Sequence, residues 1–171
     1  MPTPIENFVK QFQPENTVLL FGAGASIPSG APSVSEIILH LAKTLNEPTE
    51  GYSFSDYSSL FEMRFGRKEL ISRIRDLFVG LQPTGGMSNI SDYKRRCIFT
   101  TNYDDLIEKC YLKKDKKMRI FSSNFDFGGA SNPLETPLMK IHGTIDKDVS
   151  DGNNSRLILT IEDNELVESY H

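Results

Sequence analysis

The chain has 171 residues, the length of one ordinary domain, which is enough to bury a core that holds itself together. Its net charge of −4 gives no overall positive field, which argues against partners such as nucleic acid or an anionic membrane. The two cysteines, Cys97 and Cys110, lack the spacing of a zinc site and do not indicate a secreted disulfide scaffold. We therefore expect ordinary thiols and no bound metal.

The N-terminal stretch "MPTPIENFVKQFQPEN" combines two prolines with mixed charge. It lacks the uninterrupted apolar core that a signal peptide requires. No later apolar run approaches the roughly 18 to 20 residues needed to span a bilayer. These features predict a soluble protein located in the cytoplasm.

The first predicted strand is the apolar run Val18 to Phe21, which Gly22 closes in the manner of a buried parallel strand. Further along, Ser33 followed by Glu36 has the spacing of a capping box. Apolar residues then repeat at helical spacing, which predicts a helix over about residues 34–46.

Residues 47–95 are predicted to form a helical insertion after this first strand and helix. Its beginning, 47–58, is polar and rich in turn-forming residues, and we expect no regular element there. Residues 68–79 carry apolar side chains along one helical face and predict a helix. Residues 82–92 have two adjacent glycines and no apolar period, which predicts a loop.

The second half of the chain resumes the alternation of strands and helices. "CIFTTN", residues 97–102, predicts a strand that leads directly into a helix beginning near residue 104. The lysine-rich 112–119 is most simply a solvated connector, and an anion site is the less favoured alternative. Further strands are predicted at 119–125, 137–143 and 156–160.

Alternating strands and helices predict an α/β fold, a Rossmann-like parallel sheet flanked by helices with right-handed crossovers. Ligands of such sheets bind outside the carboxyl ends of the strands. Three segments follow predicted strands and are therefore the candidate sites: Gly22–Ser26, Thr100–Asp105 and His142–Gly143.

The glycine turn fits neither of the common nucleotide-binding patterns. Gly22 and Gly24 match a dinucleotide fingerprint, but Ile27 stands where its third glycine should be, and no lysine completes a P-loop. What remains is a turn whose backbone amides can approach an anion, or a tight turn with no ligand. Pro28 and Pro32 restrict any helix here to a short one and predict a flexible loop over the site.

Single residues at the other two strand ends allow ordinary structural interpretations. Asn102 or Asp104 alone is more simply explained as a cap of the helix that follows. His142 has a usual pKa suited to proton transfer near neutrality, yet a lone histidine is more often structural than catalytic.

Taken together and in order, "GAGASIPSGAP", "TTNYDD" and "KIHG" resemble the sirtuin (SIR2) family. They are most similar to SIR2-like domains of bacterial antiphage-defence proteins. The resemblance implies a site for NAD, with the phosphates and adjoining ribose along residues Gly22, Ala23, Gly24 and Ser26. It further implies ribose contacts at Thr101, where sirtuins carry glutamine.

The same resemblance implies specific roles for the polar residues of the other two segments. Asn102 would hold the nicotinamide ribose and the attacking water, and Asp104 would receive the nicotinamide carboxamide. His142 would act as a general base at the ribose hydroxyls. Asn102 and His142 are thus the expected catalytic residues.

Two departures from the sirtuin pattern favour hydrolysis over deacylation. The chain reads "GAPSVSE" where deacylases carry Phe-Arg, and two cysteines cannot supply a zinc ribbon. The resemblance therefore implies an NAD glycohydrolase that releases nicotinamide and ADP-ribose and depletes NAD in antiphage defence. The alternatives are a non-catalytic module that binds NAD or ADP-ribose and, less favoured, an NAD-dependent protein deacylase.

Residues 1–171 are interpreted as a single SIR2-like domain that contains the insertion at 47–95. Thr160 and Asp163 predict a last helix start, while the second Gly-rich turn of sirtuin domains has no counterpart here. We therefore expect the N-terminal part of a larger domain. A homo-oligomer would supply missing walls of the site, and a fused or partner sensor domain is the other expected partner.

Overall fold

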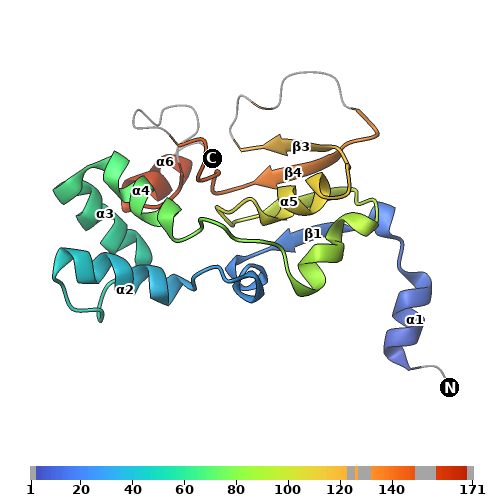
Figure 1. Cartoon of the computed structure of the whole chain (residues 1–171), viewed down its shortest axis with the longest axis horizontal. Helices are drawn as coiled ribbons and strands as arrows, with labels where there is room; N and C mark the ends of the chain where they lie inside the picture. The colour runs from blue at the N-terminus through green and yellow to red at the C-terminus, as the bar shows by residue number, and fades with distance from the viewer. Residues whose placement is uncertain (1–2, 123–125, 127–131, 149–156, 169–171) are drawn as a thin grey trace.

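The computed structural model describes residues 3–122, 126, 132–148 and 157–168. Its centre is a parallel four-stranded sheet with the strand order β1-β2-β4-β3 (Figure 1). The strands are β1 (Val18–Phe21), β2 (Cys97–Thr100), β3 (Met118–Phe121) and β4 (Thr136–Lys140). The registers place Ile98 of β2 beside Leu19 on one side and beside Leu138 on the other. The predicted α/β class is confirmed.

Helices connect and flank these strands. The α-helices are α1 (Pro4–Gln11), α2 (Val34–Leu45), α3 (Phe54–Phe65), α4 (Arg67–Asp76), α5 (Leu106–Leu112) and α6 (Ile161–Glu168). Short 3-10 helices are η1 (Pro14–Asn16), η2 (Ala23–Ala25), η3 (Ile27–Ser29) and η4 (Gly85–Asp92). The strand arrows in Figure 1 point towards the group formed by α2, α3, α4 and α6, whereas α1 projects from the opposite end.

Capping boxes explain where α2 and α3 begin, and Thr3 and Glu6 form a third one before α1. The Ser33 hydroxyl accepts from the Glu36 amide and the Glu36 carboxylate accepts from the Ser33 amide, which confirms the predicted start of α2. Ser53 and Asp56 make the same pair of bonds before α3. The prediction that residues 47–58 hold no regular element is therefore wrong from Phe54 onward.

Three further features of the structure differ from what the sequence predicted. Helix α1 was not predicted, and η4 occupies part of the expected loop 82–92. The predicted strand at 156–160 is wrong within its described part, 157–160. There the Leu157 amide donates to the Asp148 carboxylate, and the amides of 159 and 160 donate to Asp163, so these groups are used without a neighbouring strand.

A buried ion cluster joins the insertion to the end of the described chain. Arg67, at the start of α4, contacts Asp148 at 2.7 Å, Asp163 at 2.8 Å and Glu62 at 3.1 Å. It also donates to the Leu157 carbonyl at 2.7 Å. Burial alone would lower the pKa of Arg67, but the hydrogen bonds to Asp148 and Asp163 outweigh it and raise that pKa.

Two hydrophobic clusters form the core. One packs α2, α3 and α4 around side chains such as Leu41 and Phe61, and the other packs α5 and η4 on the sheet around Ile98 and Leu138. The second cluster covers one sheet face only. On the other face, Leu20 is 70% exposed, so the described residues leave that face uncovered. Nowhere in the described ranges is a helix both long and apolar enough to cross a bilayer.

Candidate functional site

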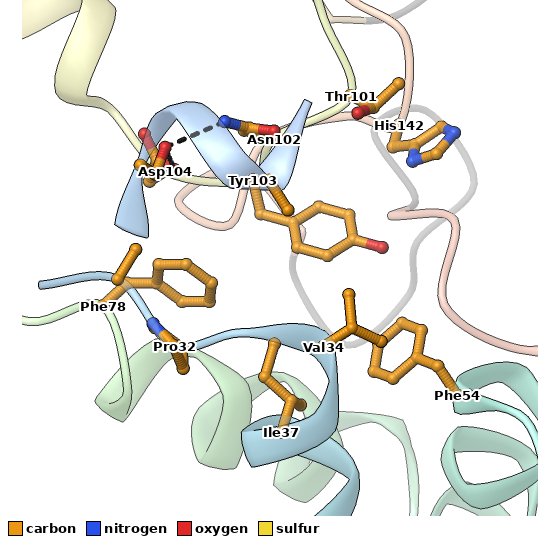
Figure 2. A pocket seen from close by; sticks show the side chains of 13 residues that line it. Pro32, Val34, Ile37, Phe54, Phe78, Thr101, Asn102, Tyr103, Asp104 and His142 are labelled. Atoms are coloured by element: carbon orange, nitrogen blue, oxygen red, sulfur yellow. Dashed lines mark hydrogen bonds between the residues drawn. The ribbon is translucent and has the colours of Figure 1, made fainter. Parts of the chain in front are cut away.

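A cavity of about 220 Å³ lies where the carboxyl ends of the strands meet the helical insertion (Figure 2). Its lining comes from the turn after β1, from the segment after β2, from the turn after β4 and from the insertion. The lining residues are Ala23, Ser26, Ala31, Pro32, Val34, Ile37, Phe54, Phe78, Thr101, Asn102, Tyr103, Asp104 and His142. The cavity thus brings together the predicted site residues except Gly22 and Gly24.

A hydrogen-bond relay fixes the orientation of the Asn102 side chain. The Ser26 hydroxyl donates to Asp104 Oδ2 at 2.7 Å, and Asn102 Nδ2 lies 2.8 Å from the same hydroxyl oxygen. Because a serine has one hydrogen to donate and the carboxylate takes it, Ser26 must accept from the Asn102 amide nitrogen. Asn102 Oδ1 is thereby turned away from Ser26; it is buried and has no partner among the described residues.

Asp104 also contacts the start of the helix that follows it. Its Oδ1 accepts from the Leu106 amide at 3.1 Å, so it satisfies the first free amide of α5, although the N-cap residue of that helix is Asp105. Its carbonyl accepts from the buried Lys140 Nζ at 2.5 Å, and Lys140 also pairs with Glu108 at 2.8 Å. Burial raises the pKa of Glu108 against the opposing effect of Lys140. These contacts tie the end of β4 to the start of α5.

The glycine turn closes into the short helix η2 beside the cavity. The amides of Ala25 and Ser26 donate back to the carbonyls of Gly22, at 2.9 Å, and Ala23, at 3.1 Å. The amides of Ala23 and Gly24 stand at the open end of this turn. A Cβ atom on Gly24 would meet nothing within 4 Å, so packing inside the chain does not require glycine there. A bare surface of this kind suits close approach by a ligand.

His142 follows β4 at the edge of the cavity. Its ring centroid lies 6.3 Å from that of Tyr103, and neither of its ring nitrogens bonds to any described residue. Burial lowers the pKa of His142 below its usual value of about 6.5. The imidazole is therefore neutral at pH 7 and able to accept a proton.

The aromatic residues of the cavity were not predicted as site residues. Tyr103 faces Val34 and Phe54 across the cavity in Figure 2, and its hydroxyl donates to the Ile158 carbonyl at 2.8 Å. Burial raises the pKa of Tyr103, so the hydroxyl stays protonated. The position of Tyr103 inside "TTNYDD" was a usable signal. Nothing local marks Phe54 or Phe78, because tertiary packing alone brings them to the site.

Within the described ranges, no three His, Cys, Asp or Glu side chains come together in a way that could ligate a metal ion. Cys97 and Cys110 are free thiols. The polar part of the cavity therefore consists of hydrogen-bonding groups, and its opposite wall is apolar.

Two comparisons relate this arrangement to known proteins. The sequence pattern of the SIR2-like domain family matches residues 96–170. The NAD(+) hydrolase ThsA of Acinetobacter baumannii (strain 532279) is 32% identical over 117 residues, which are 66% of this chain and 24% of that protein. The chain thus spans about a quarter of the length of the curated relative that it matches.

Proposed function

Because residues 96–170 match the SIR2-like domain family, we propose that the cavity binds NAD and hydrolyses the bond between nicotinamide and ribose. The products are nicotinamide and ADP-ribose. The observation that carries this proposal is the buried, unpartnered Oδ1 of Asn102, held in place by Ser26 and Asp104. The name of the similar protein, NAD(+) hydrolase, supports the same reaction.

The reaction needs a positioned water more than it needs an acid. Positive charge develops at C1′ of the ribose as nicotinamide leaves, and the leaving group is itself already cationic. Asn102 Oδ1 is an acceptor, so it holds a water by one of the water's hydrogens and directs the oxygen lone pairs at C1′. The relay through Ser26 and Asp104 keeps this acceptor in a fixed direction before substrate arrives.

His142 supplies the base. A neutral imidazole that acts as a general base on a ribose hydroxyl raises the electron density of the sugar. This stabilises the positive charge that develops at C1′. The lowered pKa of His142 keeps the ring in this neutral form at pH 7. The absence of a hydrogen bond from either ring nitrogen to a described residue supports this assignment.

The remaining cavity residues suit the two halves of NAD differently. A cavity of about 220 Å³ is below the roughly 300–1,000 Å³ of sites that enclose a whole drug-sized ligand, which favours enclosure of the nicotinamide half alone. Asp104 and Thr101 would contact the carboxamide and ribose of that half. The phosphates would lie against the open amides of Ala23 and Gly24.

We further assign this hydrolysis to NAD depletion in bacterial antiphage defence. The similarity of "GAGASIPSGAPS" and "TTNYDDLIE" to the SIR2-like domains of such proteins supports that role. A deacylase role is less favoured, because the chain reads "GAPSVSE" where deacylases carry Phe-Arg.

Nicotinamide release from NAD tests the proposal. The purified chain is expected to release nicotinamide at the same rate with and without an acetylated peptide, and His142→Ala should lower that rate about 100-fold or more. Chromatography of the products measures both. Release that requires the peptide would indicate a deacylase, and NAD binding without any release would indicate a binding module.

The pH dependence of the reaction follows from the pKa of His142. The neutral imidazole is the active form, so protonation removes activity as the pH falls through a pKa that lies below about 6.5. We expect kcat/KM to be constant above pH 7 and to decrease on the acid side. A rate profile whose acid limb is centred above pH 7 would contradict this role of His142.

A further inference from the structure

A second cavity, of about 330 Å³, lies at the opposite end of the sheet from the candidate active site. Its walls are the residues that precede β2, β3 and β4, together with the last turn of α5. No part of the proposed reaction uses this cavity. It belongs to the amino ends of the strands, whereas NAD is proposed to bind at their carboxyl ends.

Lysines from two separate segments give this cavity a positive charge. Lys94, Lys116 and Lys117 line it against a single carboxylate, that of Asp115, although the chain as a whole has a net charge of −4. Lys94 Nζ donates to the Pro133 carbonyl at 2.9 Å, and Lys116 Nζ donates to a backbone carbonyl as well. Carbonyl groups direct these ammonium groups without neutralising them, so the cavity keeps its attraction for anions.

The floor of the cavity carries a polar group that lacks a partner. Tyr111 is only 2% exposed, and its hydroxyl is buried without a hydrogen bond of ordinary geometry to any described residue, although Thr136 lies near it. A buried hydroxyl without a partner is unfavourable unless a ligand or a water forms a hydrogen bond with it. This hydroxyl is therefore available as a donor to an oxygen atom inside the cavity.

Tyr93 adds an aromatic surface to the cavity, and Arg95, which is not a lining residue, packs against it. The guanidinium of Arg95 lies 5.3 Å from the ring centroid of Tyr93 and 5.3 Å from that of Phe12. Its Nε and Nη1 atoms are buried and have no partner among the described residues. Tyr93 lines the cavity and is 56% exposed, so a planar group bound there has a ring on which to stack.

We propose that this cavity binds the phosphate of a nucleoside monophosphate. Lys116 and Lys117 neutralise the phosphate, Tyr111 donates its hydroxyl hydrogen to a phosphate oxygen, and the base stacks on Tyr93. One ligand of this class therefore neutralises the lysine charges and accepts a hydrogen bond from the Tyr111 hydroxyl.

Calorimetric titration with AMP tests the site on the full 171-residue chain. Lys117→Gln removes one of the lining charges, and Tyr111→Phe removes only the unpartnered hydroxyl, which leaves the buried ring in place. We expect the Kd for AMP to rise about tenfold in Lys117→Gln and several-fold in Tyr111→Phe. Lys113→Gln is the matched control, because this exposed lysine lies outside the cavity, and its Kd should equal that of the unaltered chain.

Adenosine and inorganic phosphate separate the contributions of the two ends of the ligand. Phosphate should bind more weakly than AMP but show the same dependence on Lys117, and adenosine should not bind at this site. An equal loss of AMP affinity in Lys113→Gln would indicate general attraction to a lysine-rich surface and overturn the proposal. AMP binding that is lost in Asn102→Ala but unchanged in Lys117→Gln and Tyr111→Phe would place the ligand in the other cavity and overturn it as well.

Discussion

Replacing Asn102 with alanine is expected to slow nicotinamide release about 100-fold or more while changing the KM for NAD only a few-fold. The variant removes the acceptor that directs water at C1′, whereas most contacts of the bound nucleotide remain. The fold should persist, because among the described residues the Asn102 side chain makes one hydrogen bond, to Ser26. Steady-state kinetics of nicotinamide release, together with a melting curve, measures both quantities.

One serine variant and one threonine variant serve as controls for this result. Ser26→Ala leaves Asn102 present but removes the hydroxyl that orients it, so we expect a smaller loss of about tenfold in kcat. Thr44→Ala deletes an exposed hydroxyl that bonds to the His40 carbonyl, and it should leave kcat unchanged. If Asn102→Ala retained more than a third of the activity, the assignment of the water-directing group would be wrong.

Replacing Arg67 with methionine is expected to lower the free energy of unfolding by about 3–5 kcal/mol. The variant leaves the carboxylates of Asp148 and Asp163 buried without their cation, and both side chains have almost no exposed surface. Urea denaturation followed by circular dichroism measures the change. Arg67→Lys should lose less stability than Arg67→Met, because lysine keeps the positive charge. It should still be less stable than the unaltered chain, because a single ammonium group cannot contact both carboxylates as the planar guanidinium does.

Arg73 provides the matched control on the same helix. It pairs with Glu69 at 2.8 Å, but both side chains are nearly half exposed. Such surface pairs contribute about 0.2–1 kcal/mol, so Arg73→Met should change stability by that amount at most. Equal losses in the Arg67 and Arg73 variants would show that burial of the Arg67 cluster does not determine stability.

Local sequence patterns predicted the parts of the fold that short-range chemistry determines. The apolar run before Gly22 gave β1, and the spacing of Ser33 and Glu36 gave the start of α2. The rule that ligands bind at the carboxyl ends of strands predicted that Asn102 and His142 lie at one site. Both line the same cavity in the structure. That arrangement supports their proposed catalytic roles.

The unpredicted parts depend on contacts between distant segments. Residues 157–160 have the composition of a strand, but the carboxylates of Asp148 and Asp163 take their amides. Pattern analysis has no means of pairing Arg67 with acids 81 and 96 residues away. The apolar wall at Phe54 likewise exists because the insertion folds back over the strand ends, which no local period encodes.

Asp104 connects the stability of this protein to its proposed chemistry in a way that limits how the site can vary. One carboxylate oxygen accepts from the first amide of α5 and the other accepts from Ser26, so a substitution there disturbs both the start of a helix and the direction of Asn102. Among the described residues, the side chains of Asn102 and His142 make no comparable contact with the start of a helix. Random mutagenesis should therefore yield soluble, inactive variants at Asn102 and His142, and poorly expressed ones at Asp104.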